Sequence, residues 1–273
     1  MEHQSSVTYG NNYLNGYQGR DLSGTGWGLK WDYIIIHESG HEWFANNITY
    51  RDIADMWVHE SFASYSEGLY TEYHFGMEAG AAYIRGNRAS IRNTAPIIGI
   101  YGVNKEGWED MYSKGANMLH TIRQVVDDDE KWRSILRGLN LDFYHQTVFG
   151  TQVEDYISQH SDKNLQKVFD QYLRNASIPI LEYTIKGNKL KYHWVNCVEG
   201  FEMPVKVTLS PGKYEFIYPT TKWKSSRSKL PNKDDFQLEE NFMFWRGGFK
   251  QQSFLNKGTR SIGEVTFATQ SEI

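Results

Sequence analysis

The sequence predicts an α+β fold in which a mainly helical domain is followed by a small antiparallel β-sandwich. Apolar residues recur at helical spacing through the first two-thirds of the chain. Beyond about residue 180 they alternate with polar residues, as they do over residues 190–194, which is the period of a half-buried strand. Turn dipeptides such as Gly187-Asn188 and Pro211-Gly212 separate the alternating segments. We therefore expect one domain over residues 1–178 and a second over residues 179–273.

The individual elements follow from the same periodicities. Helices are expected at residues 31–44, 52–73, 77–92, 109–126, 131–144, 153–160 and 165–173. Strands are expected at residues 190–194, 205–209, 214–218 and 241–245. One further strand is expected at residues 6–9, before a Gly-rich loop over residues 16–28 that is placed above a cleft.

Composition excludes several classes of protein. The chain has 273 residues, of which 40% are hydrophobic and 23% charged, as in globular proteins. A net charge of -4 gives no indication of a nucleic-acid partner or an anionic membrane surface. The single cysteine, Cys197, cannot form an internal disulfide, and no apolar run is long enough to span a bilayer. Neither a signal peptide nor any other indication of a compartment is visible, and the abrupt start at Met1 suggests an N-terminally truncated chain.

The first chemical motif is His37-Glu38-Ser39-Gly40-His41, which has the pattern H-E-x-x-H on a predicted helix. Residues four apart lie on one helix face, so both imidazoles can reach one zinc ion. Glu38 lies on an adjoining face, where its carboxylate can accept a proton from a zinc-activated water without binding the metal. We therefore predict His37 and His41 as metal ligands and Glu38 as the general base.

A catalytic zinc site needs a third protein ligand and an open fourth position. Glu60 follows His41 after eighteen residues, on the next predicted helix. A helix packed back against the first could present Glu60 to the same ion. His59 is a competing ligand, although it lies about 100° away around the helix. Asp55 is a candidate for orienting a histidine ligand, with an ordinary surface aspartate as the favoured alternative.

With these residues assigned, the sequence resembles the aminopeptidase N family of zinc metallopeptidases, which are gluzincins and include leukotriene-A-hydrolase-like enzymes. The resemblance reaches to about Leu173 and rests first on the spacing of the two histidines and Glu60. The flanking segments agree: residues 42–46, Glu-Trp-Phe-Ala-Asn, are similar to Q-W-F-G-N, and residues 57–63 are similar to W-L-N-E-G-F-A. The resemblance implies a thermolysin-like zinc catalytic domain with one Zn²⁺ per chain. The part after Ile180 resembles accessory β-sandwiches.

Two further positions are assigned through the resemblance. Residues 112–116 match Y-x-K-G-A, which implies that the Tyr112 phenol stabilises the oxyanion of the tetrahedral intermediate. The opening Met-Glu-His-Gln is similar to the end of G-x-M-E-N, which implies that Glu2 binds the free α-amine of the substrate. The expected partners are therefore peptides with a free N-terminus.

The sequence also departs from the family pattern. His3 and His59 stand where the family has Asn, and Glu42 stands where it has Gln. The glycines before the motif at Met1 are absent, and so is the β-rich N-terminal domain that precedes it in the family. None of these departures removes a predicted zinc ligand.

These predictions favour a zinc aminopeptidase in which Glu38 transfers the proton of the attacking water to the leaving amine. Two alternatives stay open. A thermolysin-type endopeptidase shares the histidine motif and a later glutamate, and would cleave substrates with a blocked amine. A zinc-binding fragment without turnover would act as a scaffold.

Overall fold

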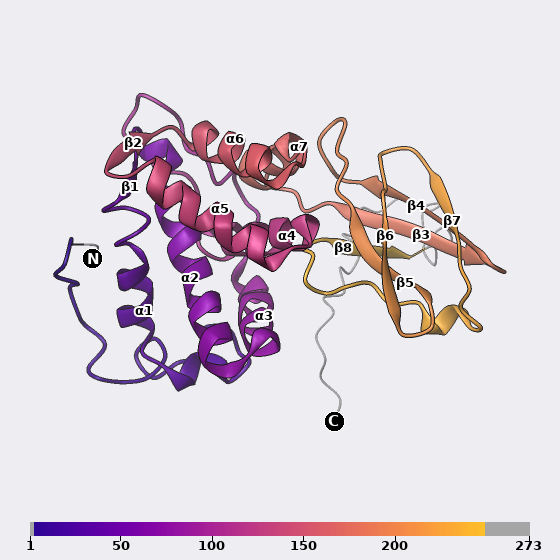
Figure 1. Ribbon diagram of the computed structural model, residues 1–273, viewed down its shortest axis with the longest axis horizontal. Coiled ribbons are helices and arrows are strands. Elements are labelled where there is room, and N and C mark those ends of the chain that lie inside the picture. The colour runs from indigo at the N-terminus through magenta and orange to yellow at the C-terminus, as the bar shows by residue number, and fades with distance from the viewer. Residues whose placement is uncertain (1–2, 249–273) are drawn as a thin grey trace, which may run out of the picture. The chain divides into compact units, whose positions relative to one another are not determined.

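The computed structural model describes residues 3–248, and Figure 1 shows its elements. These residues form two compact units. Among the described residues, the first unit covers 3–177 together with Glu240–Met243, and the second covers Ile178–Glu239 and 244–248. None of the described helices combines the length and apolar character that crossing a bilayer would require.

The first unit is built from helices. They are α1 (Tyr33–Gly40), α2 (Trp57–Phe75), α3 (Met77–Gly86), α4 (Ser113–Val126), α5 (Asp129–Asp142), α6 (Gly150–Ser161) and α7 (Gln166–Leu173). Short 3-10 turns lie at Trp27–Lys30, Ile53–Asp55, Asn87–Ser90 and Glu109–Met111. Two short strands, β1 (Ile48–Tyr50) and β2 (Gln146–Val148), pair in parallel. The predicted strand at residues 6–9 is wrong: that segment is irregular, and its Tyr9 hydroxyl donates to Asp32 Oδ2 at 2.6 Å.

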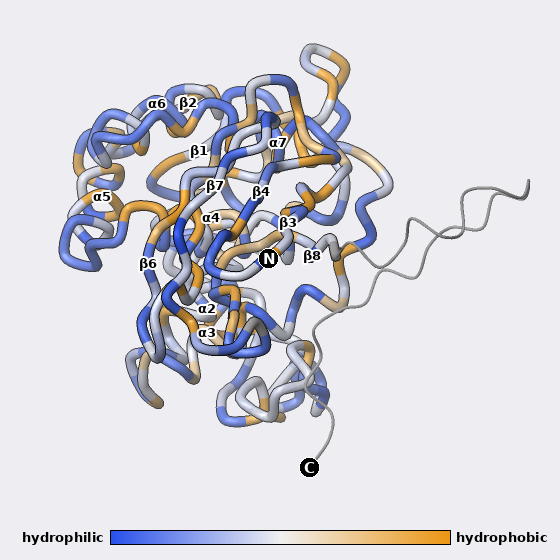
Figure 2. Tube along the Cα trace, turned by 90° about the vertical axis from the view of Figure 1, so that its right-hand side faces the viewer, coloured by the Kyte–Doolittle hydropathy of each residue, from blue (hydrophilic) through white to orange (hydrophobic). Residues whose placement is uncertain are grey.

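Helix α2 is the centre of the first unit. It packs against α1, α3 and α4, and α1, α2 and α3 stand side by side in Figure 1. Twelve of its nineteen residues are buried, because neighbours cover it on several sides. Outer helices bury only a stripe: α5 buries Trp132, Ile135 and Leu139, at helical spacing. Figure 2 shows the same amphipathic pattern as hydrophilic and hydrophobic stretches that alternate along α5.

Helix α1 is shorter than predicted. It begins after Asp32, whose carboxylate accepts a hydrogen bond from Ile35 N at 3.3 Å and caps the helix. It ends at Gly40, and His41 is the C-cap residue with φ -67° and ψ -15°. Because His41 keeps right-handed helical angles, it stays on the same face as His37 although the helix ends before it.

The second unit is a β structure, as expected. A four-stranded sheet has the order β7-β4-β3-β8, and β5 and β6 form a separate pair. The strands are β3 (Ile180–Lys186), β4 (Lys189–Val195), β5 (Val205–Ser210), β6 (Lys213–Ile217), β7 (Lys224–Arg227) and β8 (Trp245–Gly248). Leu190, Tyr192 and Trp194 of β4 are buried on one face of the sheet, and Val205 and Val207 of β5 are buried too. Both sheets therefore have one apolar face, as a sandwich requires.

Two details of the second unit differ from the expectation. The sheet is not wholly antiparallel, because β8 runs parallel to β3 with Ile180 opposite Trp245. The strand predicted at residues 241–245 is wrong over most of its length. Glu240–Met243 belongs to the first unit instead, where Met243 N donates to Thr121 Oγ1 at 3.0 Å.

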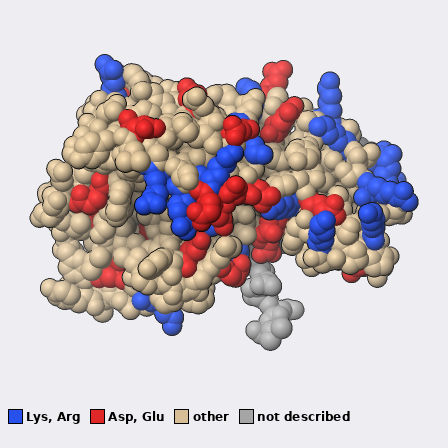
Figure 3. All heavy atoms as spheres, viewed as in Figure 1, with Lys and Arg blue, Asp and Glu red and all other residues tan. Residues whose placement is uncertain are grey.

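Acidic and basic side chains are mixed at the centre of the face drawn in Figure 3. Several charged side chains of the first unit are paired. In the first unit, Arg123 binds Glu72 at 2.6 Å and Asp129 at 2.7 Å, and Arg174 binds Glu154 at 2.6 Å. The mixture agrees with the small net charge of -4.

Candidate active site

Two histidines and one glutamate meet where α1 packs on α2. His37 lies on α1, His41 caps its end, and Glu60 lies in the first turn of α2. One ligand atom from each lies within 4.8 Å of the other two, and all three side chains are buried. Gly40 allows the close approach, since a Cβ at this position would lie 3.3 Å from the Ala63 Cα. The helix packing thus brings together residues that are far apart in sequence.

The distances within this group suit a metal ion. Glu60 Oε2 lies 3.2 Å from His37 Nε2 and 3.6 Å from His41 Nε2. Metal–ligand bonds of about 2.1 Å in tetrahedral geometry separate neighbouring donors by roughly 3.4 Å. Two imidazole nitrogens and one carboxylate oxygen form a donor set that catalytic zinc sites use. The residues present therefore fit a zinc ion.

The orientation of both imidazoles is set through the Nδ1 atoms. His37 Nδ1 lies 2.7 Å from Glu67 Oε1, and His41 Nδ1 donates to the Phe44 carbonyl at 3.0 Å. Both Nε2 atoms face Glu60 Oε2, where an ion would bind. A carboxylate on the outer nitrogen of a histidine ligand fixes its tautomer and raises its basicity.

Sequence reasoning did not identify Glu67. It lies on α2, seven residues after Glu60, and is almost fully buried. Two helical turns return to nearly the same face, so this spacing was a usable signal. The Tyr83 hydroxyl donates to Glu67 Oε2 at 2.5 Å, so the carboxylate is held from both sides.

The two carboxylates dominate the electrostatics around His37. Burial disfavours the His37 imidazolium, but hydrogen bonds to Glu60 and Glu67 outweigh burial and raise its pKa to about 10. Burial also raises the pKa of Tyr33 well above its usual value, with Glu67 adding to the shift, so this phenol stays neutral. The site is thus an acidic, buried environment that favours a bound cation.

His59 does not join the group. Its Nε2 accepts a hydrogen bond from the Tyr50 amide at 3.2 Å and lies 3.1 Å from Thr49 Oγ1. This nitrogen therefore faces β1 rather than the triad. Asp55, considered as a partner for a histidine ligand, instead accepts hydrogen bonds from the Tyr101 hydroxyl at 2.7 Å and from the Gly150 amide at 2.9 Å.

Of the three other predicted site residues, Glu38 and Tyr112 lie near His37. Glu38 is half-buried on α1, next to His37. The Tyr112 ring centroid lies 6.0 Å from that of His37. Tyr112 stands just before α4, and this segment is fastened to α2, because Ser61 Oγ donates to the Met111 carbonyl at 2.7 Å. Glu2 lies outside the described residues.

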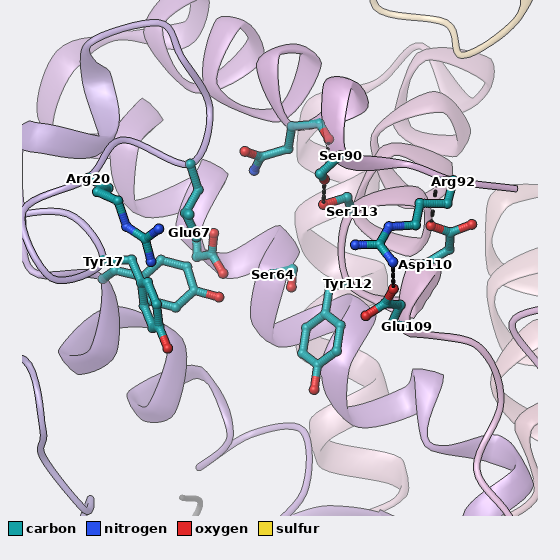
Figure 4. Close-up of a pocket in the computed structure, with 13 residues that line it drawn as sticks. Tyr17, Arg20, Ser64, Glu67, Ser90, Arg92, Glu109, Asp110, Tyr112 and Ser113 are labelled. Atoms are coloured by element: carbon teal, nitrogen blue, oxygen red, sulfur yellow. Dashed lines mark hydrogen bonds and ion pairs between the residues drawn. The ribbon is translucent and has the colours of Figure 1, made fainter.

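A cavity of about 450 Å³ adjoins the triad. Its lining includes Tyr33, Glu67 and Tyr112, each of which lies against His37. Figure 4 shows Tyr17 and Arg20 on one side of the cavity, Glu109, Asp110 and Arg92 on the other, and Ser64 between them. The predicted loop over residues 16–28 contributes Tyr17, Arg20 and Leu22 to the lining.

The chain is similar to known peptidases. The peptidase family M1 domain matches residues 1–172. Over 168 residues the chain is 26% identical to the tricorn protease-interacting factor F2 of Thermoplasma acidophilum, covering 58% of this chain and 21% of that protein. It is also 26% identical over 168 residues to aminopeptidase N of Lactobacillus helveticus, covering 54% of this chain and 19% of that protein. The chain spans about a fifth of the length of these relatives.

A solved structure supports the fold. The aminopeptidase A of Legionella pneumophila, crystallised in complex with aspartic acid, superposes with a TM-score of 0.57 at 16% identity. The match covers 76% of this chain and 25% of that one. The sequence match extends over the whole helical part of the chain and includes the histidine motif, Glu60 and Tyr112. The chain therefore belongs to the peptidase M1 family.

Proposed function

We propose that this chain is the zinc-binding catalytic part of an aminopeptidase that removes N-terminal residues from peptides. The observation that carries the proposal is the convergence of His37, His41 and Glu60 within 4.8 Å, with both Nδ1 atoms engaged elsewhere. Membership of a peptidase family supports the reaction class. The names of relatives such as aminopeptidase N support a substrate with a free amine.

In the proposed reaction each residue has a separate task. His37, His41 and Glu60 hold the zinc ion, which when bound supplies the Lewis acid that polarises the peptide carbonyl and acidifies water. Glu38 accepts the proton of the attacking water and passes it to the leaving amine. The Tyr112 phenol donates a hydrogen bond to the oxyanion that forms at the carbonyl.

Glu2 is proposed to bind the substrate's α-amine, and this contact would restrict cleavage to the first peptide bond. The β unit that begins near Ile178 is proposed to be an accessory domain. The catalytic part is proposed to comprise residues 1–178, and the accessory part residues 179–273.

Metal analysis is the first test. Elemental mass spectrometry of the purified chain is expected to find one zinc ion per chain, and no zinc in the Glu60→Ala and His41→Ala variants. His59→Ala is the matched control, because His59 is buried in the same region but faces β1. Zinc retained in Glu60→Ala would overturn the three-ligand site.

Activity is tested with amino-acid anilides and with the same compounds blocked at the α-amine. Hydrolysis of the free amine alone is expected. Equal cleavage of the blocked substrate would instead indicate an endopeptidase. Zinc binding without any cleavage would indicate a scaffold, and joining the chain to a preceding β-rich domain would then show whether activity depends on that domain.

A further inference from the structure

The cavity beside the triad offers a place for the part of a substrate that lies next to the cleaved bond. Its volume of about 450 Å³ lies within the usual range for small-ligand pockets. Tyr33 stacks on the His37 ring at a centroid distance of 5.4 Å and an angle of 15°. A ligand group bound in the cavity therefore lies beside Tyr33 and Tyr112, and both of these rings lie against His37 of the triad.

The cavity is assigned to the leaving side of the bond. Tyr33, which lines it, is the first residue of α1. The first described residues approach the opposite end of the helix, where Ser5 N donates to Glu42 Oε1 at 2.5 Å. Under the proposed function the N-terminal segment binds the amine, and its contact with Glu42 at that end leaves the cavity beside Tyr33 for the residue after the cleaved bond.

A tight turn presents Arg20 to this cavity. Tyr17 and Arg20 exchange two backbone hydrogen bonds, of 2.9 and 3.1 Å, across Gln18 and Gly19, which both have positive φ. Such a two-residue turn holds the flanking side chains as a cross-strand pair. The Arg20 guanidinium accordingly lies 5.6 Å from the centre of the Tyr17 ring.

The buried side-chain amide of Asn11 holds this turn in place. Asn11 Oδ1 accepts a hydrogen bond from Gln18 N at 2.6 Å, and Asn11 Nδ2 donates to the Gly16 carbonyl at 2.8 Å. The Tyr17 ring in turn packs edge-on against Tyr33 at 5.4 Å. Arg20 is thus connected to the triad through two packed aromatic rings.

The charge of Arg20 is available, unlike the other charges in the lining. Glu67 is bound by His37 and Tyr83, and Asp110 accepts the amides of Arg92 and Asn93. Arg92 pairs with Glu109 at 2.8 Å. Within residues 3–248, no carboxylate forms an ion pair with Arg20, whose guanidinium meets only the Tyr17 ring face.

We propose that Arg20 binds a carboxylate on the residue that follows the cleaved bond, and so selects substrates with an acidic leaving group. This inference rests on the proposed function. A planar guanidinium held over a ring is suited to bind a carboxylate through two parallel hydrogen bonds. The carboxylate is either the C-terminus of a dipeptide or the side chain of Asp or Glu in the second position.

The test compares leucyl-alanine, leucyl-alanine amide and leucyl-aspartate amide on the zinc-loaded chain. The ratio of kcat/KM for leucyl-alanine to that for leucyl-alanine amide is expected to fall about tenfold in Arg20→Gln, the size expected for a charge-assisted hydrogen bond. Arg92→Gln is the matched control, because it removes the same charge from the same cavity but from an existing pair. Its ratio is expected to stay within about twofold of wild type.

The source of the carboxylate is read from the second comparison. A preference for leucyl-aspartate amide over leucyl-alanine amide that disappears in Arg20→Gln assigns the side chain, whereas its absence assigns the C-terminus. An unchanged ratio for both substrate pairs in Arg20→Gln, or an equal loss in Arg92→Gln, overturns the proposal.

A binding measurement distinguishes a failure of this inference from a failure of the proposed function. Calorimetry on the zinc-loaded Glu38→Gln protein is expected to give about tenfold tighter binding of leucyl-alanine than of its amide, and Arg20→Gln removes the difference. Hydrolysis of leucine anilide reports on the aminopeptidase itself. Anilide cleavage without any dependence on Arg20 sinks only the present inference, whereas failure to cleave any substrate sinks the proposed function and leaves calorimetry to decide on Arg20.

Discussion

At the scale of single residues, the site is defined by which nitrogen of each histidine is already engaged. His37 and His41 are both held through Nδ1, one by a carboxylate and one by a carbonyl. The same helix carries both carboxylates around His37, since Glu60 and Glu67 lie two turns apart on α2. Buried carboxylates are costly unless they are paired, and here both are hydrogen-bonded to His37.

Glu67 is expected to strengthen zinc binding without touching the ion. Changing Glu67→Gln should lower zinc affinity by about 10- to 100-fold, the usual effect of losing the partner of a histidine ligand. Competition with a chromophoric chelator measures this. Glu72→Gln on the same helix is the control, because that carboxylate pairs with Arg123 instead. Equal losses in both variants would contradict a specific role of Glu67.

His120 is expected to make the first unit sensitive to acid. Burial lowers its pKa to about 3, with Arg88, Arg123 and Arg85 adding to the shift against a hydrogen bond to Asn241. Unfolded histidine titrates near 6.5. The unfolded chain therefore binds an extra proton between these values, and stability that is present above pH 6.5 is lost as the pH falls toward 3.

Proton uptake by His120 on unfolding lowers the free energy of unfolding by about 3 kcal/mol between pH 7 and pH 4. The loss on acidification should be smaller by about that amount in His120→Gln, which cannot take up the proton. Urea unfolding of both proteins at the two pH values measures the difference. Protonation of the metal ligands is common to both proteins and cancels in the comparison. An identical pH dependence would show that His120 titrates normally in the fold.

At the scale of elements, close helix contact positions Tyr112. Helix α4 follows Tyr112 directly and packs on α2 at Gly115. A Cβ on Gly115 would lie 1.9 Å from Ser61 Oγ and 2.6 Å from Ser61 Cβ. Ser61 Oγ also donates a hydrogen bond to the Met111 carbonyl. Ser61 therefore contacts the chain on both sides of Tyr112, at Met111 before it and at Gly115 after it. The glycine of the Y-x-K-G-A motif thus has a structural reason.

Replacing Gly115 by Ala should therefore destabilise the chain by about 2 kcal/mol or more through overpacking, despite the better helix propensity of Ala. Gly138→Ala is the matched control, since the Cβ there would meet the hydroxyl end of the half-buried Tyr156 side chain, which can move. Chemical unfolding compares the two. Equal effects would mean that the α2–α4 contact is adaptable.

At the scale of the whole molecule, the first unit is not continuous in sequence. Glu240–Met243 belongs to it although about sixty residues of β structure intervene. Asn241 accepts hydrogen bonds from Arg85 at 2.6 Å and from His120 at 3.1 Å, and Met243 N donates to Thr121. The Tyr172 hydroxyl donates to the Met243 carbonyl. The helical unit is therefore completed by a segment from beyond the β strands.

A chain that ends at Ser177 is expected to keep its helices but to unfold more easily than the full chain. Loss of the four hydrogen bonds to Asn241 and Met243, at about 1 kcal/mol each, lowers its stability by roughly 4 kcal/mol. Far-UV circular dichroism at 222 nm during urea titration follows the helical signal. Asn241→Ala in the full chain should reproduce part of the loss. Full stability of the shortened chain would show that this segment contributes nothing.

The sequence by itself determined most of what is local. Periodicity placed the seven described helices, with ends that differ by up to six residues, since helix formation depends on residues three and four apart. The one-turn spacing of His37 and His41 defined a pair of nitrogens on one face for the same reason. Strands with strict alternation, such as β4, were equally visible. The next predicted helix offered Glu60 as a third ligand, which the family resemblance supported, and the structure brings this residue to the same pair.

Which distant groups meet depended on tertiary packing. It turned His59 toward β1, placed Glu67 on His37, and sent residues 240–243 back to the helical unit. It also set β8 parallel to β3 and left Arg20 facing a cavity without an ion-pair partner in the described chain. These outcomes depend on how elements pack after they form, and that energy comes from contacts between residues far apart in sequence, on which local periodicity carries no information.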